Sequence, residues 1–251
     1  MMAANLKSFH KAIIVVLLLS GCGPKIPPPK YQAVIVVDKT NSIVYSDPAK
    51  LKQEIARGLE QTYNAAKDDI QLSILKITGK TQVIPAFDRF EEQYPDEEDE
   101  GRTYQAELLR WKARKRTWIS DQERLIDSLI ECPCKSNTTD IFSIFNGIQE
   151  AKENHEPWDS VNVYILSDMT NTSAPFNMSK LTSFDTALNR GKMVCQDLIA
   201  QGQISAGSIK NLHLIIYTPG NMQNTGLIKR FWEGFFKQWG LTENQYQFEG
   251  E

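Results

Sequence analysis

Residues 33–42 read AVIVVDKTNS, and this stretch decides the fold. Its first five residues are apolar and mostly β-branched, which is typical of a strand buried on both faces of a parallel sheet. The next five are polar and begin with Asp38, at the end of the strand where open α/β sheets bind their ligands. We therefore expect an α/β domain with a polar site after its first strand.

Strand and helix patterns alternate along the rest of the chain. The turn at Gly79-Lys80 joins two strand patterns and predicts a hairpin, hence one antiparallel strand. The alternation predicts a doubly wound, mostly parallel central sheet with helices on both faces. Further helices are expected at 48–67, 139–153, 184–201 and 227–239, and further strands at 70–74, 82–87, 161–166, 212–217 and 246–248.

The first 21 residues read as a lipoprotein signal peptide. Two lysines precede the apolar stretch 12–19, which spans about 12 Å as a helix and is too short for a bilayer core of ~30 Å. The following LSGC resembles the bacterial lipobox, which implies that the thiol of Cys22 carries lipid. The alternative is an ordinary export signal followed by a structural cysteine. Residues 22–30 then read as a Pro-rich tether and 31–251 as one domain.

Export places the domain in the cell envelope, facing the periplasm. Gly23 follows the lipobox cysteine, and by resemblance to Gram-negative sorting rules this favours the outer membrane. The compartment is oxidising, so we expect Cys195 to form a disulfide with Cys132 or Cys134.

Composition excludes several classes of protein. The chain has 251 residues, of which 41% are hydrophobic and 24% charged, so wholesale disorder is excluded. A net charge of −3 gives no support for nucleic-acid binding, and three histidines leave little room for a His-rich metal site. The chain contains no G-x-S-x-G, P-loop or G-x-G-x-x-G string, so it is not expected to be an enzyme.

Oxygen-bearing side chains gather at the expected carboxyl edge of the sheet. They comprise two carboxylates and three hydroxyls, a set that suits Mg²⁺ or Mn²⁺ and not zinc. A D-x-T-x-S string after a strand also serves as an N-cap or an Asx-turn, so a purely structural role stays open. The candidate metal ligands are Asp38, Thr40, Ser42, Thr139 and Asp168.

These positions resemble the metal-ion-dependent adhesion site of the von Willebrand factor A domain family. The family pattern is D-x-S-x-S after the first strand, a Thr just before a helix and an Asp after the fourth strand, and the five residues match it in order. The resemblance implies that Thr40 and Ser42 bind the metal directly. It also implies an open coordination position, which a Glu or Asp of a partner protein fills.

The chain departs from the family pattern at three places. Thr40 replaces the usual Ser, Asn137-Thr138 replaces the common Gly-Gly, and a charged helical insertion occupies 90–133. Ser120 and Glu123 resemble a capping box, which predicts a break in the insertion's helix. The basic residues of this helix are either solvated or form a surface for a partner or for anionic lipid.

The insertion and the lipid signal leave a second function open. The chain would then be a metal-independent scaffold or interaction lipoprotein of an envelope assembly, such as a conjugation or secretion apparatus. In the first function it captures a protein partner through the metal. Both functions tether the domain to a membrane through Cys22.

Overall fold

A computed structural model describes residues 30–40, 47–65, 70–77, 82–90, 94–95, 102–131, 139–153, 158–206, 209–218 and 225–250. The strands are β1 (Tyr31–Asp38), β2 (Ile70–Ile77), β3 (Gln82–Phe90), β4 (Ser160–Leu166), β5 (Leu212–Thr218) and β6 (Tyr246–Gly250). The α-helices are α2 (Pro48–Ala65), α3 (Arg102–Glu131), α4 (Ser143–Glu153), α5 (Phe184–Ala200) and α6 (Thr225–Trp239). Two short 3₁₀ helices are η1 (Met178–Lys180) and η2 (Glu243–Gln245).

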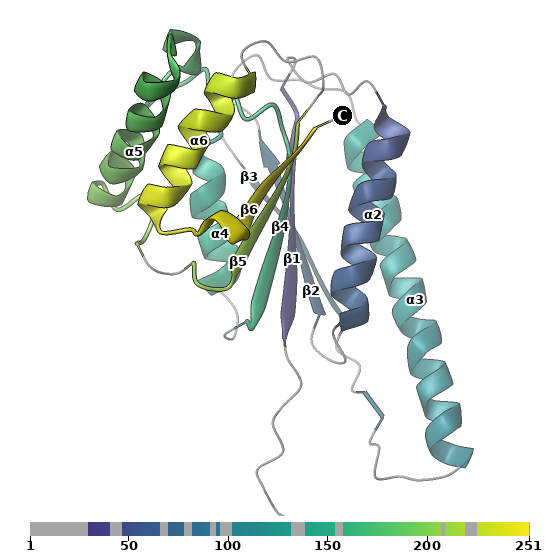
Figure 1. The fold of residues 1–251 in the computed structure, drawn as a ribbon. Coiled ribbons are helices and arrows are strands. Elements are labelled where there is room, and N and C mark those ends of the chain that lie inside the picture. Colours follow the sequence, from purple (N-terminus) through teal and green to yellow (C-terminus); the bar gives the residue numbers. More distant parts are fainter. Residues whose placement is uncertain are drawn as a thin grey trace, which may run out of the picture.

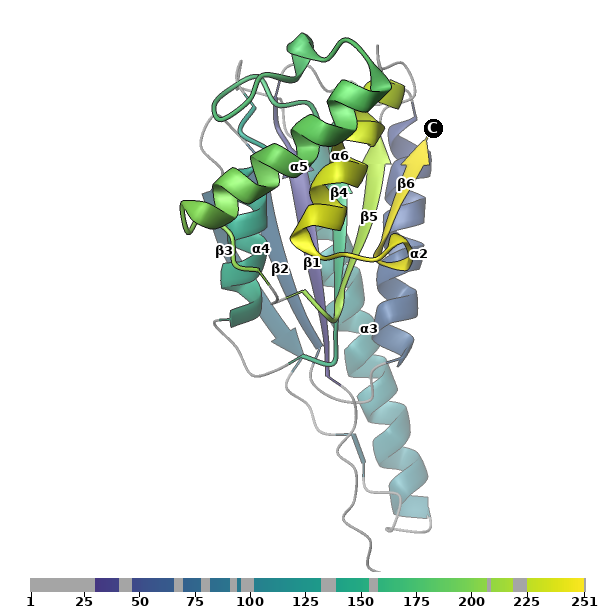
Figure 2. The same ribbon diagram turned by 60° about the vertical axis from the view of Figure 1, so that its left-hand side comes forward.

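The six strands form one sheet in the order β3-β2-β1-β4-β5-β6. All neighbouring pairs are parallel except β2 and β3, which form the expected antiparallel hairpin. Helices α4, α5 and α6 cover one face of the sheet, and α2 and α3 cover the other (Figures 1 and 2). The predicted doubly wound α/β fold is therefore confirmed.

The order of the strands reverses beside β1. The chain builds outward from β1 through β2 to β3, and then returns to add β4 on the other side of β1. In sheets of this kind, the crevice at such a reversal lies outside the carboxyl ends of the two strands that flank it. The carboxyl ends of β1 and β4 are the ends that carry Asp38 and Asp168.

Strand β1 contributes to two separate hydrophobic cores. Val34 and Val36 point toward α4, α5 and α6, whereas Ala33, Ile35 and Val37 point toward α2 and α3. Successive side chains of a strand point to opposite faces, so a strand between two helical layers needs an unbroken apolar run. The AVIVV run meets that requirement.

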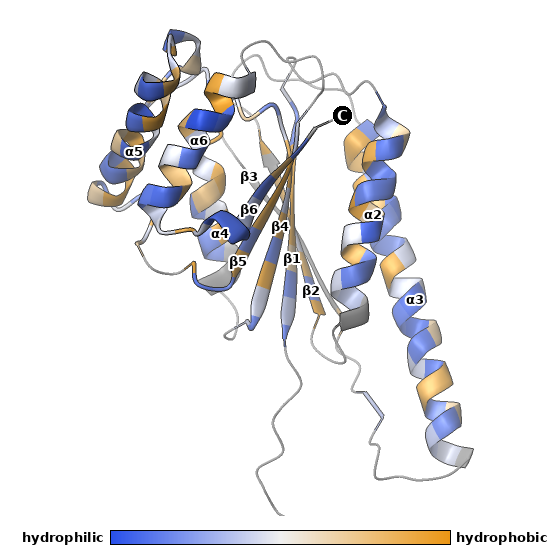
Figure 3. Cartoon of the chain, viewed as in Figure 1, coloured by the Kyte–Doolittle hydropathy of each residue, from blue (hydrophilic) through white to orange (hydrophobic). Residues whose placement is uncertain are grey.

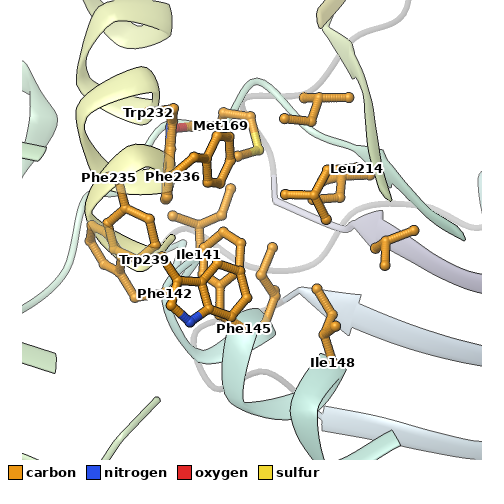
Figure 4. Close-up of a cluster of buried hydrophobic side chains, with 14 of the residues drawn as sticks. Ile141, Phe142, Phe145, Ile148, Met169, Leu214, Trp232, Phe235, Phe236 and Trp239 are labelled. Carbon is orange, nitrogen blue, oxygen red and sulfur yellow. The ribbon is translucent and has the colours of Figure 1, made fainter. Parts of the chain in front are cut away.

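The aromatic residues of α6 fill the larger core, as Figure 4 shows. The ring of Phe145 lies 5.2 Å from that of Phe235 and 5.2 Å from that of Trp239, measured between centroids. Trp232 is fully buried, and its indole Nε1 donates a hydrogen bond to the carbonyl oxygen of Met169 at 2.8 Å. This bond connects the core to the loop that follows β4.

Helix α3 differs from the expected structure. It is continuous over thirty residues, so the predicted break at Ser120 is wrong. The partly buried Trp118 and the buried Gln122 and Ile126 follow one another at i+4 spacing across this position, and Trp118 packs edge-on against Tyr63 of α2. Packing on α2 therefore holds one face of a single helix in place, and Ser120 is an interior residue.

Helix α4 begins at Ser143, four residues later than expected. Asp140 lies in the segment before it, and its Oδ1 accepts the backbone N–H of Ser143 at 3.4 Å. Thr139 therefore precedes the helix and is not part of it. None of the helices in the described ranges has the length and apolar character that crossing a membrane requires.

Candidate metal centre

Asp38 is a buried carboxylate at the carboxyl end of β1. Only 2% of the residue is exposed. Its Oδ1 accepts the backbone N–H of Thr40 at 2.9 Å, and its Oδ2 accepts the hydroxyl of Ser167 at 2.7 Å. Burial raises the pKa of Asp38 from 3.8 to about 6, although the hydrogen bonds from Ser167 and Thr40 oppose the increase. The charge of Asp168 raises this pKa further, so the two carboxylates lie within electrostatic reach of each other.

Asp168 belongs to a tight turn after β4. Its Oδ1 accepts the backbone N–H of Thr170 at 2.8 Å. Met169, the next residue, has a φ of 55°, in the left-handed region that a non-glycine residue adopts only where its surroundings impose it. The backbone N–H of Met169 donates to the hydroxyl of Ser167 at 2.9 Å. Ser167 thus connects the turn to Asp38.

Thr139 is held against the same loop. Its backbone N–H donates to the hydroxyl of Thr172 at 3.1 Å, and its carbonyl oxygen accepts the hydroxyl of Ser173 at 3.0 Å. Asn171 is fully buried, and its Oδ1 accepts the backbone N–H of Ile141 at 3.1 Å. The segment before α4 and the loop after β4 therefore form one connected unit.

The structure brings four of the five predicted ligands to one end of the sheet. Asp38, Thr40, Thr139 and Asp168 are all at most 8% exposed. Ser42 lies outside the described residues. Ser167 and Asn171 were not predicted as functional residues from the sequence. They connect the end of β1, the loop after β4 and the segment before α4. Ser167 was detectable as the polar residue between a buried strand and Asp168, whereas Asn171 carries no such signal.

Lys39 occupies an unusual position between two of the predicted ligands. Its backbone N–H donates to the carbonyl oxygen of Ile77 at 3.1 Å, and the residue is only 3% exposed. Its Nζ donates to the carbonyl oxygen of Ile130, in the last turn of α3, at 3.2 Å. The negative end of a helix dipole favours a cation at this position. Lys39 therefore connects the candidate centre to the C-terminal end of α3.

The residues present fit a hard divalent cation. Among the described residues, no group of three or more His, Cys, Asp or Glu side chains is arranged to hold a metal ion. The candidate donors are two carboxylates with neighbouring hydroxyls. Mg²⁺ commonly takes one or two carboxylates and keeps several waters, which matches such a set. A carboxylate that accepts two hydrogen bonds retains further lone pairs for a metal. The fit is to Mg²⁺ or Mn²⁺ and not to a soft metal.

Cys195 does not form the expected disulfide. It is a free thiol with no exposed surface, on the side of α5 that packs into the larger core. Burial raises its pKa to about 12, so the thiol stays protonated and unreactive. The two expected partners, Cys132 and Cys134, lie outside the described residues, as does Cys22.

A groove of about 460 Å³ lies between α2, β5 and β6. Its floor includes Ile215 and Tyr217, and charged residues such as Arg57 and Glu249 stand around it. Burial raises the pKa of Tyr217 to about 12, and the nearby Tyr164, Glu54 and Glu249 contribute in that order. None of the four predicted ligands in the described ranges is among the residues that line this groove.

The sequence matches no protein-family model and no curated protein. Among solved structures, the chain is similar to manganese-loaded TRAP protein from Plasmodium vivax (TM-score 0.42, 13% identity), with 88% of this chain and 68% of that chain covered. It is also similar to a von Willebrand factor type A protein from Catenulispora acidiphila (TM-score 0.46, 9% identity, 89% and 39% covered). A third is the PilB minor pilin from Streptococcus sanguinis (TM-score 0.45, 8% identity, 91% and 59% covered). Similarities of this size carry no conclusion about what this chain binds.

Proposed function

We propose that the chain is a lipid-anchored envelope protein that captures a protein partner through a divalent cation. The cation is Mg²⁺ or Mn²⁺, and the role is one of binding and not of catalysis. Its ligands would be Asp38, Thr40, Ser42, Thr139 and Asp168.

The pair formed by Asp38 and Asp168 carries this proposal. Both carboxylates are nearly buried, and they lie close enough for the charge of one to raise the pKa of the other. Desolvation and mutual repulsion both raise the free energy of two ionised carboxylates in this situation. A divalent cation between them offsets both costs, because it is the largest local charge in any site that holds one.

The surrounding residues prepare the site for such a cation. The hydrogen bonds from Thr40 and Ser167 fix both oxygens of Asp38, and the turn at Met169 fixes Asp168. The hydroxyls of Thr40 and Thr139 belong to the same end of the sheet. When bound, the cation supplies positive charge at which a carboxylate of a partner protein can complete the coordination.

The lipid anchor is the second part of the proposal. The signal peptide and the lipobox-like LSGC support acylation of Cys22 and export to the envelope. Several acyl chains on one cysteine anchor a protein stably, because each buried CH₂ contributes about 0.8 kcal/mol. Mass spectrometry of the membrane-extracted protein tests this part, since an unmodified Cys22 would refute it.

Titration calorimetry with Mn²⁺ and Mg²⁺ tests the metal. We expect one binding event in the native protein and at least a ~10-fold weaker one in Asp38→Asn, because an amide removes the charge but keeps the shape. Asp185→Asn is the matched control, since it makes the same chemical change at an exposed position on α5. Absence of binding heat in the native protein would refute the metal site.

A metal-independent interaction surface is the second candidate function. The observation that favours it is Leu109 of α3, which at 67% has the most exposed large apolar side chain among the described residues. Partner capture from envelope extracts separates the two candidates. If EDTA abolishes partner capture, the metal-dependent function is supported. If Leu109→Asp abolishes capture and EDTA has no effect on it, the interaction surface on α3 is supported.

A further inference from the structure

We propose that a basic face of α3 lies against the anionic phospholipid headgroups of the membrane that carries the chain. The face consists of Arg110, Lys112, Arg114 and Arg116, which are all exposed, together with Leu109. The inference rests on the anchoring proposed above, and the experiment below separates the two.

The first observation is the charge of this face. Residues 108–120 contain five basic residues and no acidic one. The fifth basic residue, Lys115, is buried and lies over the ring of Trp111 at 4.7 Å. Within the described part of the chain, no ion pair involves Arg110, Lys112 or Arg116. Figure 3 shows this half of α3 mainly in blue, interrupted by an orange band.

The second observation is the position of this face relative to the point where the chain enters the domain. Trp111 packs edge-on against Phe90, with ring centroids 5.8 Å apart. Phe90 pairs with Ile70 in the sheet, and Ile70 pairs with Tyr31, the first residue of β1. Trp111 is therefore level with the amino end of β1. The basic face begins where the chain from the tether reaches the sheet.

The third observation is that α3 extends past this end of the sheet, as Figures 1 and 2 both show. The nine residues 102–110 span about 13 Å at 1.5 Å per residue. Cys22 precedes Lys30 by eight residues, and a segment of that length would reach about 25 Å if it were polyproline II. The projecting residues include Arg110 and also Glu107, whereas Lys112, Arg114 and Arg116 follow Trp111 and lie alongside the sheet. A tether of this length would let this side of α3 lie on the headgroups. The positive end of its helix dipole points the same way.

An acidic protein segment is the other occupant that these charges could attract, and the chain's own run at 96–100 is one such segment. The location of the basic face favours lipid, because the proposed tether would enter the domain at the same end of the sheet. Attraction to an anionic surface operates within about one Debye length, ~8 Å at physiological salt. Lipid composition therefore distinguishes the two occupants.

Lysine acetylation followed by mass spectrometry measures the contact in the acylated full chain. The protein is reconstituted in vesicles of phosphatidylcholine alone, or of phosphatidylcholine with about a quarter phosphatidylglycerol. We expect Lys112 to react at least about fivefold more slowly on the anionic vesicles than on the neutral ones. We expect about 0.5 M NaCl to remove this difference in rate. Lys50, exposed at the start of α2, should react equally on both.

Two charge-reversal variants complete the experiment. Arg110→Glu/Arg116→Glu should abolish the protection of Lys112. Lys180→Glu/Arg190→Glu makes the same change of net charge at exposed positions outside α3 and should leave the protection intact. Equal reactivity of Lys112 on both kinds of vesicle, or equal effects of the two variants, would overturn the inference.

Vesicle flotation separates this result from the fate of the anchor. A chain that floats with neutral vesicles but shows no protection of Lys112 on anionic ones has the anchor and lacks the contact. A chain that floats only with anionic vesicles, and only at low salt, has the contact and lacks the anchor.

Discussion

Asp38 is a single residue whose ionised side chain is expected to reduce the stability of the folded chain. Its carboxylate is buried, accepts two hydrogen bonds and lies near a second carboxylate. A buried acid whose pKa is raised disfavours folding at neutral pH, because the folded state holds its proton more tightly than the unfolded chain does. A bound cation would remove this cost, which is why the residue makes sense as a ligand.

The pH dependence of stability follows from the pKa of Asp38. The folded value is about 6 and the ordinary value 3.8, so the destabilisation is complete above pH 6 and disappears below about pH 4. Without divalent cations, Asp38→Asn should be more stable than the native protein by up to about 3 kcal/mol at pH 7.5 and no different at pH 4. Urea unfolding of both proteins in EDTA measures this. A variant less stable than the native protein at pH 7.5 would show that the charge is compensated internally.

Asn171 is the residue whose loss should do the most damage to the loop after β4. Its Nδ2 donates to the carbonyl oxygens of Ser173 and Phe176 at 2.7 and 2.9 Å, and its Oδ1 accepts from Ile141. Asn171→Ala removes all three of these hydrogen bonds, one from the buried Ile141 and two to half-buried residues, and should destabilise the fold by about 2 to 4 kcal/mol. Thr172 is an exposed neighbour whose hydroxyl accepts one hydrogen bond, from the backbone N–H of Thr139, and Thr172→Ala should cost about 1 kcal/mol. Chemical unfolding compares the free energies of unfolding of the two variants. Equal losses of stability would mean that Asn171 is not the main residue that holds this loop in place.

At the scale of elements, the backbones of α5 and α6 lie so close together at two glycines that a Cβ atom at either position would clash. A Cβ built on Gly191 would lie 1.9 Å from the carbonyl oxygen of Phe231, and one on Gly234 would lie 2.1 Å from that of Leu188. Both obstacles are backbone atoms, which cannot rotate away. These two glycines therefore set the distance between the helices, and with it the position of the aromatic core that supports the candidate centre.

Substitution of either glycine by alanine should separate the two helices. We expect Gly191→Ala and Gly234→Ala each to destabilise the protein by about 2 kcal/mol or more, despite the better helix propensity of alanine. Gly226→Ala is the control within α6, because its nearest contacts, at 3.2 Å, are ring atoms of the exposed Phe184. Thermal unfolding ranks the three variants, and a neutral Gly234→Ala would contradict the close packing.

The continuity of α3 is also testable. If Ser120 is an interior helix residue, Ser120→Ala should stabilise the protein by a few tenths of a kcal/mol, because alanine has the higher helix propensity. If a new helix started at Ser120, the same change would remove an N-cap and cost about 1 kcal/mol. Denaturant unfolding distinguishes a gain from a loss.

At the scale of the whole molecule, the local patterns of the sequence predicted the layers correctly. The AVIVV run indicated a strand between two helical layers, and Gly79-Lys80 indicated the antiparallel hairpin. The position of Asp38 at the carboxyl end of β1 followed from the same patterns. These features depend on residues close together in the chain, so periodicity and turn chemistry reveal them.

Features that depend on distant residues were not predictable. Lys39 reaches the carbonyl of Ile130, 91 residues away, and Gln32 of β1 donates to Ser73 of β2, 41 residues away. The unbroken course of α3 depends on its packing against Tyr63 of α2 and overrides a capping signal that looked sufficient by itself. Tertiary packing decided each of these cases.

Anomalous diffraction at the manganese edge, from crystals of the protein grown with Mn²⁺, tests the metal site most directly. We expect one strong peak at the carboxyl ends of β1 and β4, within bonding distance of the hydroxyl of Thr40 and next to Asp38 and Asp168, either directly or through water. A map without a peak there, in crystals that show Mn²⁺ bound elsewhere, would contradict it.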